Sequence, residues 1–319
     1  MASFARTFTR VPVFSRPVQG ILFKTASVFI FTIMVTLVKV LSDRLPVGEI
    51  LFSRNFFALI PVLAMVTWRR EWGVAFKTKQ PWGHVGRGML GVASMFLWFA
   101  SLSVLPLHDA MAISFSAPLI TVALAAIVLG EKVRMYRWSA VGLGLVGILF
   151  VLSPHLGAGG FDASMTWGAM ACLLSAAFMA LAMITIRKLT ATERTTTIVV
   201  YFSIISTVLS LLTLPFGWTM PSAADAVMLV AIGLCGGIGQ ILLTQAYRCA
   251  EASTIAPFDY TTIVWVLLFG VLIFSEIPTI EVFLGSAIVV GAGLFVIYRE
   301  HRLGIDRTKD RRASTPSKA

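Results

Sequence analysis

Two ionisable residues lie deep inside long apolar segments, where a charge has few uses besides chemistry or binding. Lys24 and Lys39 also interrupt segment 20–41, but Lys24 opens that segment and Lys39 lies near a membrane edge. Arg54 lies within segment 46–67, and Asp259 follows Pro257 within segment 252–275. A charge at bilayer depth is costly and usually faces a cavity or a partner. We therefore take Arg54 and Asp259 as candidate substrate contacts, with a purely structural ion pair as the equal alternative for each.

Polar and aromatic residues gather in corresponding parts of the two halves of the chain, close to Pro118 and Pro257. Proline interrupts helical hydrogen bonding, and interrupted helices form the binding sites of many carriers. A flat ligand that carries amide groups could stack on such rings and bond to Gln and Ser. The further candidate substrate contacts are Trp98, Phe115, Ser116, Gln240, Gln245, Tyr247 and Tyr260.

Two glutamates, Glu131 and Glu276, end apolar segments on opposite expected faces of the membrane. They are either polar groups at the interface or gating residues that pair with neighbouring helices, and we favour gating. His108 beside Asp109 marks another segment boundary, where a solvated turn is expected in preference to a proton relay.

Motifs for nucleotide or metal chemistry are missing or misplaced. Residues 142–147 match G-x-G-x-x-G, but they lie inside a charge-free segment, where small residues let helices approach closely. The sequence contains no G-x-x-x-x-G-K-[ST] loop and no H-E-x-x-H motif. We expect no cofactor, no metal and no catalytic residue, although an intramembrane lipid-modifying enzyme remains the rival class.

The composition indicates that these apolar segments are surrounded by lipid. Apolar residues make up 57% of the 319 residues and charged residues only 13%, against about 25% charged in a soluble domain. The net charge of +11 is confined to short clusters between apolar runs, which indicates membrane topology and not nucleic-acid binding. The lipid bilayer and a small-molecule substrate are the expected partners, and pairing with a second copy is left open.

Ten segments are long enough to be spans, because a helix needs roughly 20 apolar residues to cross the hydrocarbon core. They are 20–41, 46–67, 88–108, 110–130, 138–161, 163–186, 195–224, 226–247, 252–275 and 282–298. With ten spans, 23 of the 26 Lys and Arg residues lie on one side. The positive-inside rule then places both termini in the cytoplasm of a bacterial inner membrane.

The chain reads as two repeats. A shift of 145 positions places Glu131 on Glu276 and Gly91 on Gly236. Each half holds five spans, and five is odd, so the second half enters the membrane from the opposite face. The expected fold is an all-α integral membrane protein with ten transmembrane helices in two inverted five-helix repeats. Its parts are a cytoplasmic segment 1–19, halves 20–154 and 155–298, and a disordered cytoplasmic tail 299–319.

Three stretches carry a family resemblance: Pro-Leu-His-Asp-Ala-Met-Ala-Ile-Ser-Phe-Ser-Ala-Pro-Leu (106–119), Leu-Gly-Glu-Lys-Val (129–133) and Trp-Ser-Ala-Val-Gly-Leu-Gly-Leu-Val-Gly (138–147). Over residues 20–298 the chain resembles the ten-span EamA-type branch of the drug/metabolite transporter superfamily. Ser-Glu-Ile-Pro at 275–278 departs from the plainer Gly-Glu pattern.

The resemblance implies a central cavity between the halves and transport without ATP. Within the branch the chain looks most like the bacterial riboflavin transporters, with the S-adenosylmethionine transporters next. Riboflavin uptake is thus the first expected function. S-adenosylmethionine transport and amino-acid or drug efflux are the alternatives.

Overall fold

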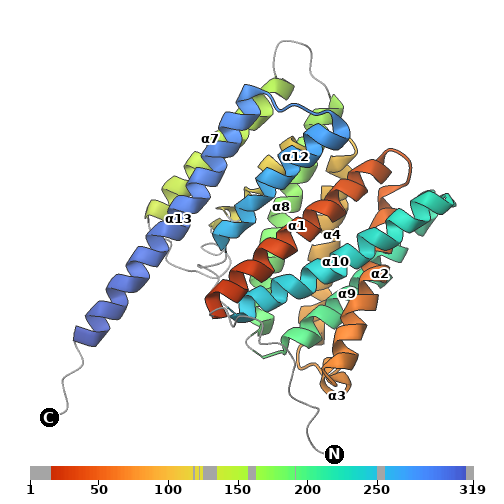
Figure 1. Ribbon diagram of the computed structural model, residues 1–319, viewed down its shortest axis with the longest axis horizontal. Helices are drawn as coiled ribbons and strands as arrows, with labels where there is room; N and C mark the ends of the chain where they lie inside the picture. Colours follow the sequence, from red (N-terminus) through yellow and green to blue (C-terminus); the bar gives the residue numbers. More distant parts are fainter. Residues whose placement is uncertain are drawn as a thin grey trace, which may run out of the picture.

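The protein is a bundle of long helices, as Figure 1 shows for the computed structural model. The structure describes residues 16–117, 119–121, 123–124, 135–156, 163–190, 192–249 and 256–313, and these contain no strand. The first half comprises α1 (Arg16–Ser42), α2 (Val47–Trp68), the short α3 (Trp72–Ala75), α4 (Pro81–Leu102), α5 (Leu107–Ser114) and α7 (Met135–Leu156). The second comprises α8 (Ala163–Thr190), α9 (Thr195–Leu211), η1 (Leu214–Phe216), α10 (Ala223–Cys249), η2 (Ala256–Thr261), α12 (Thr262–Phe274) and α13 (Ile280–Ala313).

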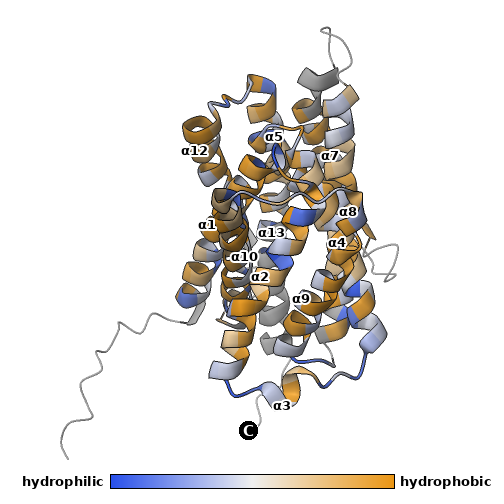
Figure 2. Cartoon of the chain, turned by 90° about the vertical axis from the view of Figure 1, so that its right-hand side faces the viewer, coloured by the Kyte–Doolittle hydropathy of each residue, from blue (hydrophilic) through white to orange (hydrophobic). Residues whose placement is uncertain are grey.

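The helices are apolar along their lengths and polar at their ends (Figure 2). Among the described residues, α1, α2, α4, α8 and α10 are each long and apolar enough to cross a membrane. Shorter apolar helices cover residues 138–151, 196–211, 258–274 and 280–295. Proline marks several helix starts, with Pro46 and Pro106 directly before α2 and α5 and Pro81 opening α4, positions where its missing N–H is not needed.

The connections lie on two opposite faces of the bundle. One face, the terminal face, carries the start of α1, the short α3 and the end of α13 (Figure 1). The other, the distal face, carries residues 43–46, 103–106, 212–222 and 275–279.

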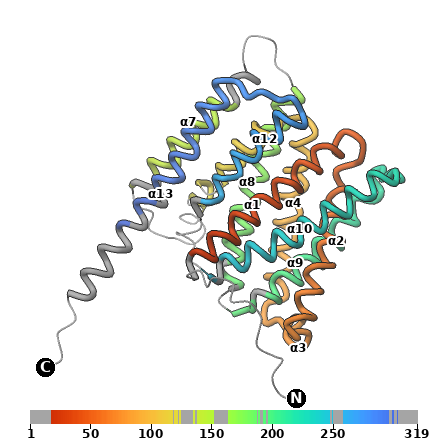
Figure 3. The backbone as a smooth tube through the Cα atoms, in the orientation of Figure 1, coloured from red at the N-terminus to blue at the C-terminus, as the bar shows by residue number. Residues whose placement is uncertain are grey.

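Most of the helix packing in the bundle is between helices of different halves, and the packed pairs are equivalent under the repeat. The first helix of each half packs along the third of the other half, α1 on α10 and α8 on α4. The second helices, α2 and α9, pack against each other, and so do the fifth, α7 and α13, which form one edge of the molecule (Figures 1 and 3). The arrangement is that of two inverted repeats related by an approximate two-fold axis.

Individual contacts obey the same symmetry. Ser27 Oγ donates to the Gly239 carbonyl at 2.8 Å, where α1 crosses α10. Ser175 Oγ donates to the Ser94 carbonyl at 2.7 Å, where α8 crosses α4. Ser94 and Gly239 differ by 145 positions, whereas Ser27 and Ser175 differ by 148. The repeat offset is therefore slightly longer in the first helices than in the third.

Close backbone approach between α7 and α13 confirms helix packing as the use of the G-x-G-x-x-G string. A Cβ built on Gly147 would lie 2.8 Å from the Gly285 carbonyl oxygen, and one on Gly285 only 2.5 Å from that of Gly147. Gly142, the first glycine of the string, faces open space. Only small residues allow this crossing.

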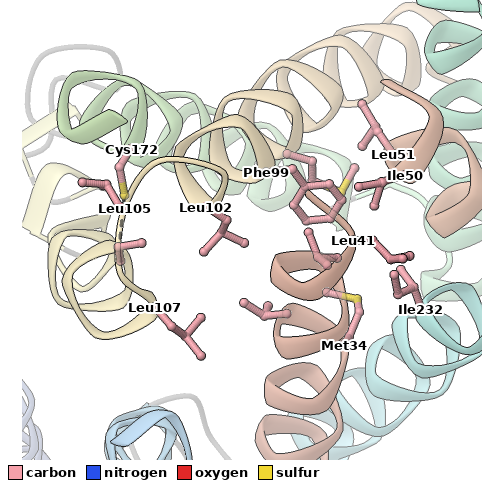
Figure 4. Packing of buried hydrophobic residues seen from close by; sticks show 14 of the residues in the cluster. Met34, Leu41, Ile50, Leu51, Phe99, Leu102, Leu105, Leu107, Cys172 and Ile232 are labelled. Atoms are coloured by element: carbon pink, nitrogen blue, oxygen red, sulfur yellow. Dashed lines mark hydrogen bonds between the residues drawn. The ribbon is translucent and has the colours of Figure 1, made fainter. Parts of the chain in front are cut away.

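The main core joins both halves around α1. Figure 4 shows Met34 and Leu41 of α1 among Ile50 and Leu51 of α2, Phe99 of α4 and Ile232 of α10. The cluster continues through Leu102, Leu105 and Leu107 to Cys172 of α8. A continuous packed core between two halves lets a local change on one side act on the other.

Two boundaries differ from those expected from the sequence. The third span was expected at 88–108, but α4 covers Pro81–Leu102 and includes His84 and Arg87. The expected span was defined as a segment without charged residues, so it began after Arg87, although the fold buries Arg87 within α4. The tail was expected to be disordered from residue 299, yet α13 continues to Ala313, in a segment rich in arginine, which is a good helix former.

Candidate functional site

The fourth span of each half is interrupted at the same place. In the first half α5 ends at Ser114 and a turn follows at Phe115 and Ser116. In the second half the 3-10 helix η2 precedes α12. Phe115 and Tyr260 differ by 145 positions, and their ring centroids lie 5.4 Å apart at an interplanar angle of 47°. The two interruptions thus face each other between the halves.

An ion pair lies at the interruption of the second half. Lys24 Nζ of α1 is 2.6 Å from Asp259 Oδ1 of η2. The Lys24 side chain is 4% exposed, whereas that of Asp259 is 47% exposed. The carboxylate therefore has a partner on one side and an open side on the other, beside Tyr260.

The symmetry-related contact between the halves is uncharged. Cys172 of α8 corresponds to Lys24 at an offset of 148, and Ser114 corresponds to Asp259 at an offset of 145. Cys172 Sγ and Ser114 Oγ lie 3.6 Å apart, and the thiol also donates to the Ala110 carbonyl at 3.3 Å. The two halves have therefore diverged chemically at both positions of this contact.

Arg54 of α2 is buried, at 7% exposure. Its Nη1 donates to Asn55 Oδ1 at 2.9 Å. Its Nε faces Gly236 of α10, where a Cβ would lie 3.1 Å away, and Met34 of α1 lies on the same side. The side chain thus points between helices of both halves and away from lipid.

A set of polar contacts that we call the distal clasp joins the halves at the distal face. It consists of Lys39, Leu107, His108 and Glu276. Lys39 Nζ lies 3.2 Å from Glu276 Oε1 and donates to the Leu105 carbonyl at 2.7 Å. Glu276 Oε2 accepts from the Leu107 N–H at 2.8 Å, at the first residue of α5, and His108 Nδ1 is 3.7 Å away. A carboxylate is well placed at a helix N-terminus.

The repeat partner of Glu276, Glu131, lies outside the described residues, as does Pro118. His108 was expected in a solvated turn, but its side chain is only 9% exposed, and its Nε2 lies 3.2 Å from Asp109 Oδ1. His108 is buried because it is part of the distal clasp, beside Glu276.

The remaining predicted contacts are spread over several environments. Trp98 is half-buried and packs against the main core, while Ser116 is buried beside Phe115 and its Oγ has no hydrogen-bond partner within the described chain. Gln240 and Gln245 are half-buried on α10. Tyr247 belongs to α10, but its side chain is outside the description. In the described parts of the chain no three His, Cys, Asp or Glu residues meet as metal ligands would.

Sequence reasoning missed three cations that the fold places inside the bundle. Lys24 was expected at the opening of segment 20–41, Lys39 near a membrane edge, and Arg87 in the connection just before segment 88–108. Lys24 pairs with Asp259, Lys39 with Glu276, and Arg87 is 7% exposed. The repeat offset of 148, which aligns Lys24 with Cys172 inside α8, is the signal that could have located Lys24 within the bundle.

Comparison with known proteins assigns this architecture to a family. The EamA-like transporter family matches residues 18–153 and 166–299, one match for each half. The chain is 31% identical over 264 residues to an S-adenosylmethionine uptake transporter of Rickettsia bellii (strain RML369-C), covering 83% of this chain and 88% of that protein. It is 28% identical over 291 residues to a riboflavin transporter of Rhizobium johnstonii (strain DSM 114642 / LMG 32736 / 3841), covering 90% and 94%.

A solved crystal structure has the same fold, with a TM-score of 0.64 at 19% identity over 90% of this chain and 99% of that chain. The fold therefore agrees with the sequence matches along nearly the whole chain. The chain belongs to the EamA-like transporter family.

Proposed function

We propose that the protein is a secondary carrier that takes up a small charged metabolite through a bacterial inner membrane, with S-adenosylmethionine as the first candidate substrate. The observation that carries the proposal is the half-exposed Asp259 carboxylate beside the rings of Tyr260 and Phe115. A carboxylate next to aromatic faces suits an organic cation. S-adenosylmethionine joins such a cation, a sulfonium, to a flat adenine ring, and one relative carries this substrate in its name.

Alternating access fits the closed distal clasp. Lys39 and Glu276 hold the distal ends of α1, α5 and α12 together, so substrate bound near Asp259 would be shielded from that face. Separation of this clasp, with closure at the terminal face, would expose the site to the other side. Inverted repeats provide the two alternative closures.

The orientation of the carrier has its own test. We place the terminal face in the cytoplasm, because the basic residues concentrate there. Reporter fusions after residue 313 and within 43–46 should report opposite sides, with the C-terminal fusion cytoplasmic. A periplasmic C-terminal reporter would reverse the proposed orientation.

The substrate test is uptake of radiolabelled S-adenosylmethionine by bacteria that have no uptake system for it. Cells that express the wild type should accumulate label. Asp259→Asn should abolish uptake, whereas Asp43→Asn, a change at an exposed distal loop, should not alter it. Absence of uptake by well-expressed wild type would remove this substrate.

Riboflavin is the second candidate, favoured by the contact between Phe115 and Tyr260 and by the relative named for riboflavin transport. An aromatic stack contributes about 0.5–1.5 kcal/mol beyond area burial. Tyr260→Leu should then weaken apparent affinity by roughly 2- to 13-fold. Growth of a riboflavin auxotroph on limiting vitamin measures this effect, with Trp98→Leu and Tyr247→Leu as further ring variants. Equal growth with and without the protein would exclude riboflavin uptake.

A further inference from the structure

Two buried arginines in the membrane helices have no counter-ion among the residues that the structure describes. Arg54 of α2 and Arg87 of α4 are each 7% exposed. Three of their nitrogens, Arg54 Nε, Arg87 Nε and Arg87 Nη1, are buried without a hydrogen-bond partner in the described part of the chain. None of the ion pairs between described residues includes either arginine. Leaving guanidinium groups buried in this condition is strongly unfavourable.

Repeat-related glycines make room for both guanidinium groups. Gly91 of α4 and Gly236 of α10 occupy the same position in the two repeats, 145 residues apart. A Cβ on Gly91 would collide with Arg87 Nη1 and with the Phe202 ring, and a Cβ on Gly236 would press on Arg54 Nε. The backbone is therefore opened at one position in each half, and each opening receives an arginine.

The surroundings hold Arg87 in place without neutralising it. Its guanidinium carbon lies 4.1 Å from the centroid of the Phe202 ring of α9. A cation–π contact orients the planar group and leaves its N–H edge available. Arg54 and Arg87 are thus two buried cations that the described chain leaves without a neutralising partner, as expected of an anion site in its empty state.

We propose that Arg54 and Arg87 together bind the carboxylate of the transported metabolite within the membrane. The inference rests on the proposed carrier function and narrows its substrate class. A metabolite with an amino-acid end would bring a carboxylate to the arginines. Arginine suits this role because its planar fork matches a carboxylate through paired hydrogen bonds.

The test measures ligand binding to the purified full-length protein in detergent by thermal stabilisation. Two matched pairs are compared: S-adenosylmethionine with its decarboxylated form, and methionine with methioninamide. The wild type should bind the carboxylate member of a pair more tightly. Arg54→Gln and Arg87→Gln should weaken binding of the carboxylate member roughly 10- to 100-fold, as expected for loss of a charge-assisted hydrogen bond. Binding of the member without a carboxylate should stay unchanged.

Arg44→Gln is the matched control, because Arg44 is exposed at the distal face, where its Nη1 lies 3.5 Å from Asp225 Oδ1. This variant should alter the binding of neither member of a pair. If a Gln variant does not fold, Arg54→Lys and Arg87→Lys keep the charge but lose the fork, and the same selective weakening is expected.

Three results would overturn the inference: equal weakening of both members of a pair, no stabilisation of the wild type by either carboxylate, or equally strong stabilisation by inorganic phosphate alone. Failure of the proposed substrate looks different. Cells would then not take up S-adenosylmethionine, while purified protein would still prefer methionine to methioninamide through both arginines.

Discussion

Phe115 and Tyr260 hold the same position in the two repeats, and their rings meet with centroids 5.4 Å apart. Residues related by a two-fold axis touch only where they lie close to that axis. This contact therefore marks the axis, at the interruptions of the fourth and ninth spans. Asp259 adjoins it in sequence, so the charged part of the candidate site lies where both halves can act on one ligand.

The Lys24–Asp259 pair should matter for stability as well as for uptake. Lys24→Met and Asp259→Asn each leave one member without its ionic partner and should lower the melting temperature of the detergent-purified protein. Half exposure of Asp259 keeps the loss below the roughly 3–5 kcal/mol of a fully buried pair. The double variant should regain stability but not uptake. A double variant no more stable than either single one would contradict this coupling.

The distal clasp should control access to the core beneath it. Glu276→Gln weakens the contacts to Lys39 and Leu107, so the distal face should open more often. Cys172, which is buried in the cluster that contains Leu105 and Leu107, should then react faster with a membrane-impermeant thiol reagent. Glu281→Gln at the start of α13 is the control, and the Cys172→Ser background corrects for the other thiols. Unchanged labelling would argue against a gate.

The α7–α13 crossing should tolerate no added side chain. Gly147→Val and Gly285→Val push a backbone carbonyl of the facing helix and should destabilise by about 1–3 kcal/mol, as overpacking does. Gly142→Val on the same α7 faces open space and should have little effect. Melting temperatures of the three variants measure the difference. Equal losses at Gly142 and Gly147 would indicate helix propensity as the cause.

The loop carboxylate Glu193 should contribute stability that depends on pH. Partial desolvation raises its pKa, but hydrogen bonds from Thr78 Oγ1 and the N–H groups of Lys79 and Gln80 outweigh this and hold the pKa below its ordinary value. Its contribution is thus full at neutral pH and is lost as pH falls through the lowered pKa. The melting-temperature difference between wild type and Glu193→Gln should narrow below about pH 5. A difference independent of pH would exclude an ionised Glu193.

Charge-free segments and the side of the basic clusters were sufficient to predict ten spans and inverted repeats, since lipid imposes both signals directly. They were not sufficient for residues such as Arg87, which the same reasoning assigned to a loop although α4 buries it. The position of Arg87 depends on Phe202, which is distant in sequence, and on Gly91, whose role a hydropathy pattern does not reveal. Trp98 shows the opposite limit, because an aromatic that packs in the core looks the same in sequence as one that binds a ligand.

The chemical difference between the Lys24–Asp259 ion pair and the Cys172–Ser114 hydrogen bond has a consequence for energetics. Two identical inverted halves would give inward-facing and outward-facing forms of equal free energy. Here one of the two symmetry-related contacts between the halves is charged, with a strength that depends on its exposure to water, and the other is neutral. Opening the bundle on one side or the other therefore exposes different groups to water. We expect the empty carrier to rest unequally between its two forms, with a bias that shifts when Asp259 binds a proton or a cation.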